Sequence, residues 1–157
     1  MTVTIRPFTD TDWRALARIH DAARLDELAA SVGTDAFLSL ADTYESEGLF
    51  DDVVLVAELD TEVVGFIAFA DDEITWMYVD PTRYRHGVGR ALLRSVLSTA
   101  TAPVELTVLH GNIAARALYE QEGFELVETR TGPLVGNESF TATGHIMVWN
   151  PRPVNKG

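Results

Sequence analysis

The segment formed by residues 79–93 constrains the fold more than any other part of the chain. It joins the end of an apolar strand, a basic loop and the start of a helix. Pro81 makes it unfavourable for the strand to continue past Val79. The helix that follows has the clearest helical period in the sequence, with small or apolar residues three and four positions apart. These residues are Gly89, Leu92, Leu93, Val96, Leu97 and Ala100.

The loop of this segment has the chemistry of an anion-binding site. Gly87 and Gly89 allow the backbone to approach a ligand closely, because no side chain stands in the way. The free N–H groups and the dipole of the following helix both favour negative charge at its start. Arg83, Arg85 and Arg90 add positive charge in a chain whose net charge is -12. We therefore expect the loop to hold a phosphate or pyrophosphate.

Two common phosphate motifs fit this loop poorly. A P-loop requires Gly-Lys-Ser/Thr, whereas Gly89 is followed by Arg90. A dinucleotide fingerprint requires a third glycine or alanine, where Leu92 stands, and a tight turn after the strand. Here seven residues separate Val79 from Gly87. A different nucleotide enzyme built on Gly87-Val-Gly89 is an alternative, and protection from unfolding by NAD or ATP would support it.

The rest of the chain predicts a single α+β domain over residues 1–150, followed by a flexible tail at 151–157. A strand at 3–8 precedes a helix capped by Thr9 or Asp10. A second helix begins near Thr34, with Phe37, Leu40, Ala41 and Tyr44 on its inner face. The other expected elements are strands at 53–58, 63–70, 74–79, 104–109, 124–131 and 139–149, and a helix at 112–122. This order predicts a mixed, mostly antiparallel sheet flanked by helices.

Composition narrows the classes of partner and compartment. Asp and Glu outnumber Lys and Arg by 24 to 12, which disfavours nucleic acids and anionic membranes and favours a cationic partner such as a protonated amine. An acidic surface that serves solubility alone is the alternative. Cysteine is absent, the four histidines have no metal-ligand spacing, and no segment reads as a signal or membrane span. We expect a cytoplasmic protein without a metal.

The loop resembles the coenzyme-A pyrophosphate loop of the GNAT superfamily of N-acetyltransferases, written Gln/Arg-x-x-Gly-x-Gly/Ala. In that family the backbone amides of the loop hold the pyrophosphate. The resemblance implies this role for Arg85, His86, Gly87, Val88, Gly89 and Arg90. Tyr84 stands where the family has Gln or Arg, so one side-chain contact differs while the backbone contacts are retained.

A second motif follows at the distance expected for the family. The stretch from Asn112 to Phe124 is similar to Asn-x-x-Ala-x-x-Leu/Phe-Tyr-x-x-x-Gly-Phe. The resemblance implies that Asn112 and Ala115 line the pantetheine arm and that Tyr119 lies beside the sulfur. The two motifs together imply the acyl-CoA N-acyltransferase (GNAT) fold, with acetyl-CoA as acetyl donor. The resemblance covers residues 3–149 in element order and 73–124 in motif detail.

The resemblance also implies catalytic roles. Tyr119 would be the general acid that protonates the departing thiolate, and its structural alternative is a tyrosine packed on the sheet. Glu73 would be the general base, directly or through a water, and its alternative is a solvated turn residue. Backbone N–H groups of Met77, Tyr78 and Val79 would polarise the thioester carbonyl on a bulged central strand.

The sequence thus predicts an N-acetyltransferase that moves an acetyl group to a primary amine of a small molecule or peptide in a ternary complex. A coenzyme-A-binding regulatory module without turnover is the alternative. The acceptor would bind between residues 22–35 and 132–143, where Asp26, Glu27 and Asp35 could attract a cation. His110 ends a strand nearby without an assigned role. Exposed strand edges make a homodimer an option.

Overall fold

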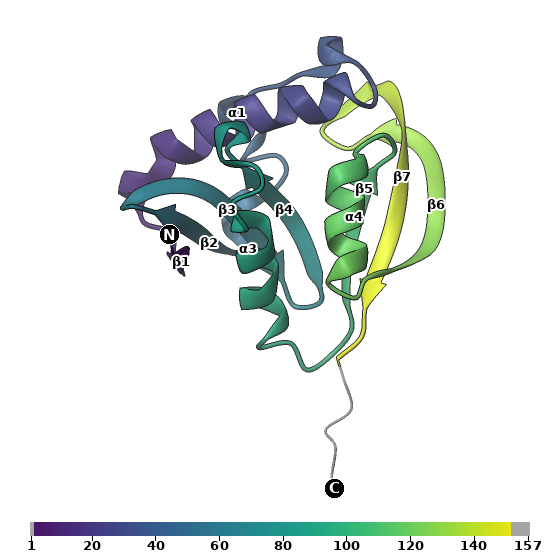
Figure 1. The fold of residues 1–157 in the computed structure, drawn as a ribbon. Coiled ribbons are helices and arrows are strands. Elements are labelled where there is room, and N and C mark those ends of the chain that lie inside the picture. Colours follow the sequence, from purple (N-terminus) through teal and green to yellow (C-terminus); the bar gives the residue numbers. More distant parts are fainter. Residues whose placement is uncertain (1, 152–157) are drawn as a thin grey trace, which may run out of the picture.

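One seven-stranded sheet organises the chain in the computed structural model, which describes residues 2–151 (Figure 1). The strand order is β1-β2-β3-β4-β5-β7-β6. The strands are β1 (Thr4–Pro7), β2 (Val53–Leu59), β3 (Glu62–Ala70), β4 (Glu73–Val79), β5 (Val104–Leu109), β6 (Glu125–Leu134) and β7 (Asn137–Trp149). The helices are α1 (Trp13–Ala29), α2 (Leu40–Thr43), α3 (Val88–Leu97) and α4 (Ile113–Gln121). The mixed sheet and flanking helices confirm the predicted fold class.

The first four strands form an antiparallel series. Its two tight turns carry residues with positive φ, at Asp60, Thr61 and Asp71. Short polar side chains suit these turns, since Asp tolerates the left-handed region better than most residues. Strand β3 lies inside the series and is buried over most of its length, which explains its continuous apolar run.

The sheet opens between β4 and β5. These neighbouring strands are parallel and pair at a single position, Glu73 opposite Glu105. Beyond that point they diverge, while β5 continues in register with β7 from Val104 to Leu109. The edge of β4 that faces β5 therefore has backbone groups without strand partners after its first residue.

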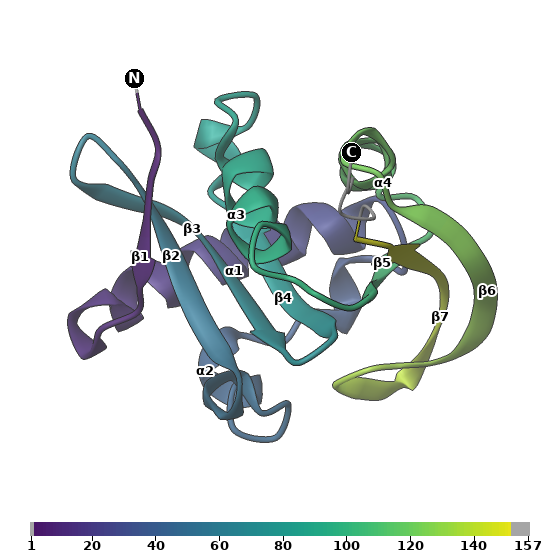
Figure 2. The ribbon, with the colours of Figure 1, turned by 90° about the horizontal axis from the view of Figure 1, so that it is seen from below.

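Helices cover both faces of the sheet, with α3 and α4 on one face and α1 and α2 on the other (Figure 2). Two apolar clusters fill the space between these layers. One joins α3 residues such as Leu92 and Val96 to Ile67 on β3. The other joins Leu16 and Ile19 of α1 to alternate residues of β2, β3 and β4. The strand alternation thus places one core on each face.

The predicted helix starting at Thr34 is wrong. The segment instead contains a 3-10 turn at Thr34–Ala36, an extended Phe37, and the short helix α2. The Ser39 side chain accepts a hydrogen bond from Asp42 N at 3.2 Å and so begins a new helix there. Leu40 is buried but Ala41 is exposed, so the expected inner face is only partly formed.

Other boundaries differ by a few residues. Helix α1 follows a 3-10 turn, Asp10–Asp12, and runs to Ala29, so Asp26 and Glu27 lie on this helix rather than in the expected connection. Helix α4 ends before Gly123, whose φ of 101° suits a helix C-terminus. Further 3-10 turns are Leu49–Asp51 and Pro81–Arg83. No helix among residues 2–151 is long and apolar enough to cross a membrane. Most of the predicted tail, residues 152–157, lies outside the described residues.

Candidate active site

A cleft of ≈ 670 Å³ occupies the opening between β4 and β5. Its walls come from both strands, from the 80–87 loop, and from the facing sides of α1, α3 and α4. It brings together almost every residue that the sequence assigns to a coenzyme. The predicted residues on its wall are Met77, Tyr78, Val79, Arg85, Gly87, Val88, Gly89, Arg90, Asn112, Ala115 and Tyr119. His86 is exposed and does not line the cleft.

Asp80 fixes the loop between β4 and α3. Its side chain is buried and accepts hydrogen bonds from Thr82 N at 3.0 Å and Thr82 Oγ1 at 2.9 Å. Arg18 of α1 donates to its other oxygen at 2.9 Å. Burial opposes ionisation of this carboxyl, but the Thr82 bonds and the Arg18 guanidinium outweigh it and lower the pKa of Asp80. The loop is therefore attached to α1 at its first residue.

The end of the loop has the backbone shape that the motif requires. Arg85 and Gly87 adopt left-handed conformations, with φ of 69° and 76°. A Cβ placed on Gly87 would meet nothing within 4 Å, so open space lies in front of this residue. Within residues 2–151, the backbone N–H groups of 85–90 donate no hydrogen bond. Free amides at a helix start beside open space can receive a pyrophosphate.

The loop arginines have more specific positions than charge counting predicts. Arg83 bonds Glu62 at 2.9 Å at the surface. Arg90 donates to Gln121 at 2.6 Å and lies 2.9 Å from Glu122, so it links α3 to the end of α4. Because Arg83 and Arg90 are paired, the backbone amides are the groups available to bind an anion directly. Arg85 is exposed beside them.

Gly89 sits where α3 meets the opposite wall of the cleft. A Cβ at this position would lie 3.1 Å from Leu118 of α4, 3.6 Å from Met77 and 3.7 Å from Val79. The first of these contacts is tighter than packed side chains normally allow. Glycine at this position therefore lets the two helices approach across the opening of the sheet.

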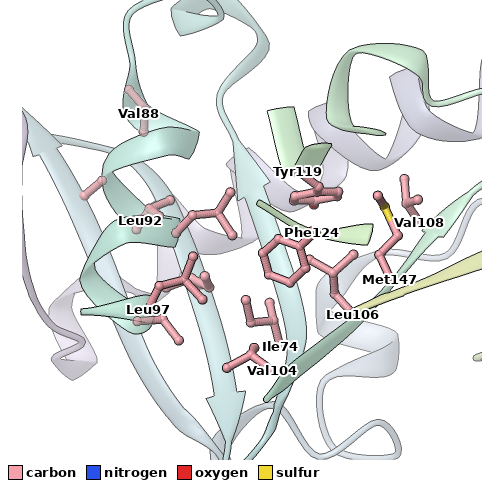
Figure 3. Packing of buried hydrophobic residues seen from close by; sticks show 14 of the residues in the cluster. Ile74, Val88, Leu92, Leu97, Val104, Leu106, Val108, Tyr119, Phe124 and Met147 are labelled. Atoms are coloured by element: carbon pink, nitrogen blue, oxygen red, sulfur yellow. The ribbon is translucent and has the colours of Figure 1, made fainter. Parts of the chain in front are cut away.

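Tyr119 forms part of the deep wall of the cleft. Its ring packs against Phe124 with centroids 5.9 Å apart, next to Leu106, Val108 and Met147 (Figure 3). The residue is 8% exposed, and its hydroxyl makes no hydrogen bond within residues 2–151. Burial raises the pKa of Tyr119 above its usual value, and the negative charge of Glu27 adds to this shift. The side chain is thus a neutral phenol at physiological pH.

The central strand β4 is bulged. The register of β3 and β4 shifts opposite Thr75, between the pairs Ala68–Trp76 and Phe69–Ile74. Met77, Tyr78 and Val79 are in regular register with β3. Because β5 has already diverged, the backbone groups of these residues on the β5 side are free of the ladder.

A second cleft, of ≈ 850 Å³, lies on the α1 and α2 side of the opening. Its walls come from α1, the 36–47 segment, β4, and the β6–β7 hairpin. The two clefts share six residues: Glu27, Ile74, Thr75, Trp76, Tyr78 and Thr107. They therefore meet through the gap between β4 and β5, where a group held in one can reach a molecule bound in the other.

Glu73, the predicted base, is exposed at the first position of β4 and borders only the second cleft. Burial of its carboxyl and the nearby charges of Glu105, Asp72 and Asp52 raise the pKa of Glu73. A raised pKa would suit a base, but the residue stands where the two strands still pair rather than where they open.

Several residues of the junction could not be predicted from the sequence. Trp76 and Thr107 have no motif, and they are found only once the strands are placed next to each other. Glu27 is predicted as one of three acidic residues near the acceptor, and the structure has it on α1 at the border of both clefts. Tyr84 lines the first cleft beside α1, and its burial, with the charges of Asp26 and Glu27, raises the pKa of Tyr84 to about 12.

Comparisons with known proteins agree with this geometry. The profile of the family described as "Acetyltransferase (GNAT) domain" matches residues 50–126, which include both motifs. The uncharacterized N-acetyltransferase YafP of Escherichia coli (strain K12) is 32% identical over 93 residues. That alignment spans 59% of this chain and 59% of the length of YafP.

Solved structures share the fold over nearly the whole chain. A GCN5-related N-acetyltransferase from Rhodopseudomonas palustris superimposes with a TM-score of 0.81 at 21% identity, covering 96% of both chains. The PaiA N-acetyltransferase of Thermoplasma acidophilum, solved with coenzyme A, gives 0.75 at 19% identity over 96% of this chain and 99% of its own. The fold is the acyl-CoA N-acyltransferase (GNAT) fold. Residues 50–126, about half of the chain, match the acetyltransferase (GNAT) domain family.

Proposed function

We propose that this protein transfers the acetyl group of acetyl-CoA to a primary amine of a small molecule or peptide. The observation that carries the proposal is the set of free amides at residues 85–90 at one end of a cleft whose deep wall holds the Tyr119 phenol. The amides would bind the pyrophosphate, and Asn112 and Ala115 would line the pantetheine arm. The thioester would then lie in the gap between β4 and β5, where the backbone of Met77–Val79 polarises its carbonyl.

The second cleft would bind the acceptor amine. Its carboxylates outnumber its cations, with Glu27, Glu47, Glu73 and Glu138 against Arg24 and Arg130. This imbalance favours a cationic acceptor. An amine with an ordinary pKa near 10.4 is neutral about once in 10³ molecules at pH 7, which costs roughly 4.6 kcal/mol. Holding amine and thioester in contact supplies about 7–11 kcal/mol, so proximity outweighs this cost.

Thermal unfolding with acetyl-CoA and coenzyme A tests the coenzyme. At a concentration of 100 times the dissociation constant, a ligand stabilises the folded state by about 2.7 kcal/mol, which corresponds to roughly 5–10 °C for a chain of this size. NAD and ATP serve as controls and should give no shift. Stabilisation by NAD or ATP alone would contradict the proposal and favour the other type of nucleotide enzyme.

Release of free coenzyme A then tests turnover. The probe amines are n-butylamine, 1,4-diaminobutane, lysine amide and a short peptide with a free N-terminus. We expect amine-dependent release with at least one of them. Tight acetyl-CoA binding without release by any amine would favour the regulatory module instead.

A further inference from the structure

Glu27 holds a position that no other charged side chain of residues 2–151 shares. It lies near the end of α1 and borders both the coenzyme cleft and the acceptor cleft. Its side chain is 17% exposed, so it stands at the inner junction rather than at a rim. A carboxylate in this place faces the point at which the two substrates would meet.

The bonds to Glu27 leave one oxygen available. Arg24 and Tyr78 both donate to Oε1, the tyrosine hydroxyl at 3.3 Å. No group among residues 2–151 donates to the other oxygen, Oε2. The two donors fix the orientation of the carboxylate. A carboxylate oxygen without a donor at a cleft wall is suited to accept an N–H from a ligand.

The unpaired phenol of Tyr119 lies on the wall of the coenzyme cleft, which Glu27 also borders. Its hydroxyl has no partner within residues 2–151, and burial together with the charge of Glu27 raises the pKa of Tyr119. The cleft therefore presents one proton acceptor from α1 and one proton donor from α4. Acetyl transfer can use both.

Glu73 is less well placed than Glu27 to accept the proton of the amine. It lies five positions before Tyr78, the residue that bonds Glu27, and it stands where β4 and β5 still pair. It borders the acceptor cleft only.

We propose that Glu27 is the catalytic residue that receives the acceptor amine and takes its proton at Oε2. This inference rests on the proposed function. The acceptor ammonium gives one proton to Glu27, and the neutral nitrogen forms a bond to the thioester carbon as the C–S bond breaks. Tyr119 donates its proton to the departing sulfur, and the tyrosinate takes the second proton of the nitrogen. Glu27 releases its proton to water, so each turnover yields one amide, one thiol and one proton.

The charged and titratable groups around Glu27 come from five parts of the chain. They are His20 and Arg24 on α1, Glu47 after α2, Tyr78 on β4, Tyr84 in the loop and Tyr119 on α4. Burial lowers the pKa of His20 and raises those of the three tyrosines. None of these groups is therefore expected to change its charge between pH 7 and 9 in a way that imitates loss of the Glu27 carboxylate.

The test compares Glu27→Gln with Glu73→Gln in the full chain, using the probe amines above. We expect Glu27→Gln to lower kcat about 10²-fold or more, with the dissociation constant of acetyl-CoA unchanged. Raising the pH toward the amine pKa should reduce the difference in kcat between Glu27→Gln and the wild type, because a neutral amine needs no base. Glu27→Asp should retain more activity than Glu27→Gln, since it keeps a carboxylate. Glu73→Gln should lower kcat less than Glu27→Gln does. The control Glu125→Gln removes an exposed carboxylate that borders neither cleft, and it should keep kcat within about twofold.

The outcomes separate this inference from the proposed function. An active wild type with an unaffected Glu27→Gln variant, or a loss that stays constant as the pH rises, would overturn the role of Glu27 alone. A large loss in Glu73→Gln with Glu27→Gln unaffected would assign the base to β4. No release of coenzyme A by the wild type with any amine would contradict the proposed function, and this inference with it. If Glu27→Gln unfolds because Arg24 loses its partner, Glu27→Asp and Tyr78→Phe are compared with the wild type instead.

Discussion

At the scale of single residues, Tyr119 shows how burial can serve both a core and a reaction. The ring packs beside Phe124, and the hydroxyl remains at the cleft without a partner in the described part of the chain. A raised pKa alone would make the phenol a weaker acid. The same dry surroundings disfavour the departing thiolate, so they also raise the pKa of the thiol that forms. The proton transfer is thus less unfavourable than the phenol pKa suggests.

Removing this hydroxyl should affect chemistry and little else. In Tyr119→Phe we expect kcat to fall about 10²–10⁴-fold, the usual range for a general acid, while the affinity for acetyl-CoA stays within about twofold. Phenylalanine keeps the packing, so the melting temperature should change little. Coenzyme release and calorimetric titration measure the two quantities. Unchanged turnover would leave Tyr119 with a packing role only.

Gly87 is a residue whose role could be predicted from the sequence. Its φ of 76° and the open space before it agree with a loop that approaches a phosphate closely. An alanine in this conformation costs roughly 1–2 kcal/mol. If the loop relaxes to escape that strain, Gly87→Ala should weaken acetyl-CoA binding by about tenfold.

A matched control for this substitution is Gly132→Ala on β6. That glycine also has open space around it, and its φ lies outside the positive range. It should leave acetyl-CoA binding unchanged. Equal effects of the two substitutions would show that the left-handed conformation is not what binding requires.

At the scale of elements, Arg6 links the first strand to its neighbours. Its Nε lies 2.7 Å from Glu58 of β2, and its two terminal nitrogens each lie 2.8 Å from an oxygen of Asp12. Asp12 also accepts from Thr9 N at 2.9 Å and so caps the turn before α1. One guanidinium therefore joins β1, β2 and the start of α1.

This link predicts a pH dependence of stability. The hydrogen bond from Arg6 lowers the pKa of Asp12 from 3.8 to about 2, and burial opposes the shift only in part. A lowered carboxyl pKa stabilises the fold above the unfolded value and is lost as pH falls through the folded value. Unfolding free energy should therefore drop between about pH 4 and pH 2. Asp12→Asn should be less stable at pH 6 and lack this part of the drop. Parallel curves would contradict the link.

Elements set by local sequence were predicted well, and those set by tertiary contacts were not. The strand at 104–109 and the period of α3 follow from alternation and helical spacing, and the structure confirms them. The segment after Thr34 has helical spacing too. Its packing under α1 instead fixes Phe37 in an extended conformation and starts α2 at Ser39.

At the scale of the whole molecule, the sheet consists of two halves that meet at one strand pair. Strands β1 to β4 form one half, and β5, β7 and β6 form the other. The two coenzyme motifs lie on opposite halves, so neither motif alone builds the cleft. The insertion of β7 between β5 and β6, and the position of Glu27 at the junction, depend on contacts between distant residues. The local pattern of the sequence therefore predicts the coenzyme wall but not the acceptor wall.

Glu122 connects the two halves on the side of the coenzyme. Its side chain is 9% exposed and lies 2.9 Å from both Arg90 and Arg94, which belong to α3 in the other half. Acetyl-CoA would contact α3 and α4 together. If the link between the two helices is weaker, they are less ordered in the free protein, and binding must meet a larger ordering cost. Glu122→Gln should therefore weaken acetyl-CoA binding several-fold and lower the unfolding free energy by about 1 kcal/mol.

The control is Glu120→Gln, which makes the same charge change on the same helix. Glu120 pairs with Arg116 at 3.0 Å within α4, so its loss does not touch the link across the cleft. Its effect on acetyl-CoA affinity should be within about twofold, since an exposed pair of this kind is worth a few tenths of a kcal/mol. Thermal unfolding with and without acetyl-CoA measures both variants. If Glu120→Gln weakens binding as much as Glu122→Gln, the negative charge near α4, and not the link between the halves, determines the affinity for acetyl-CoA.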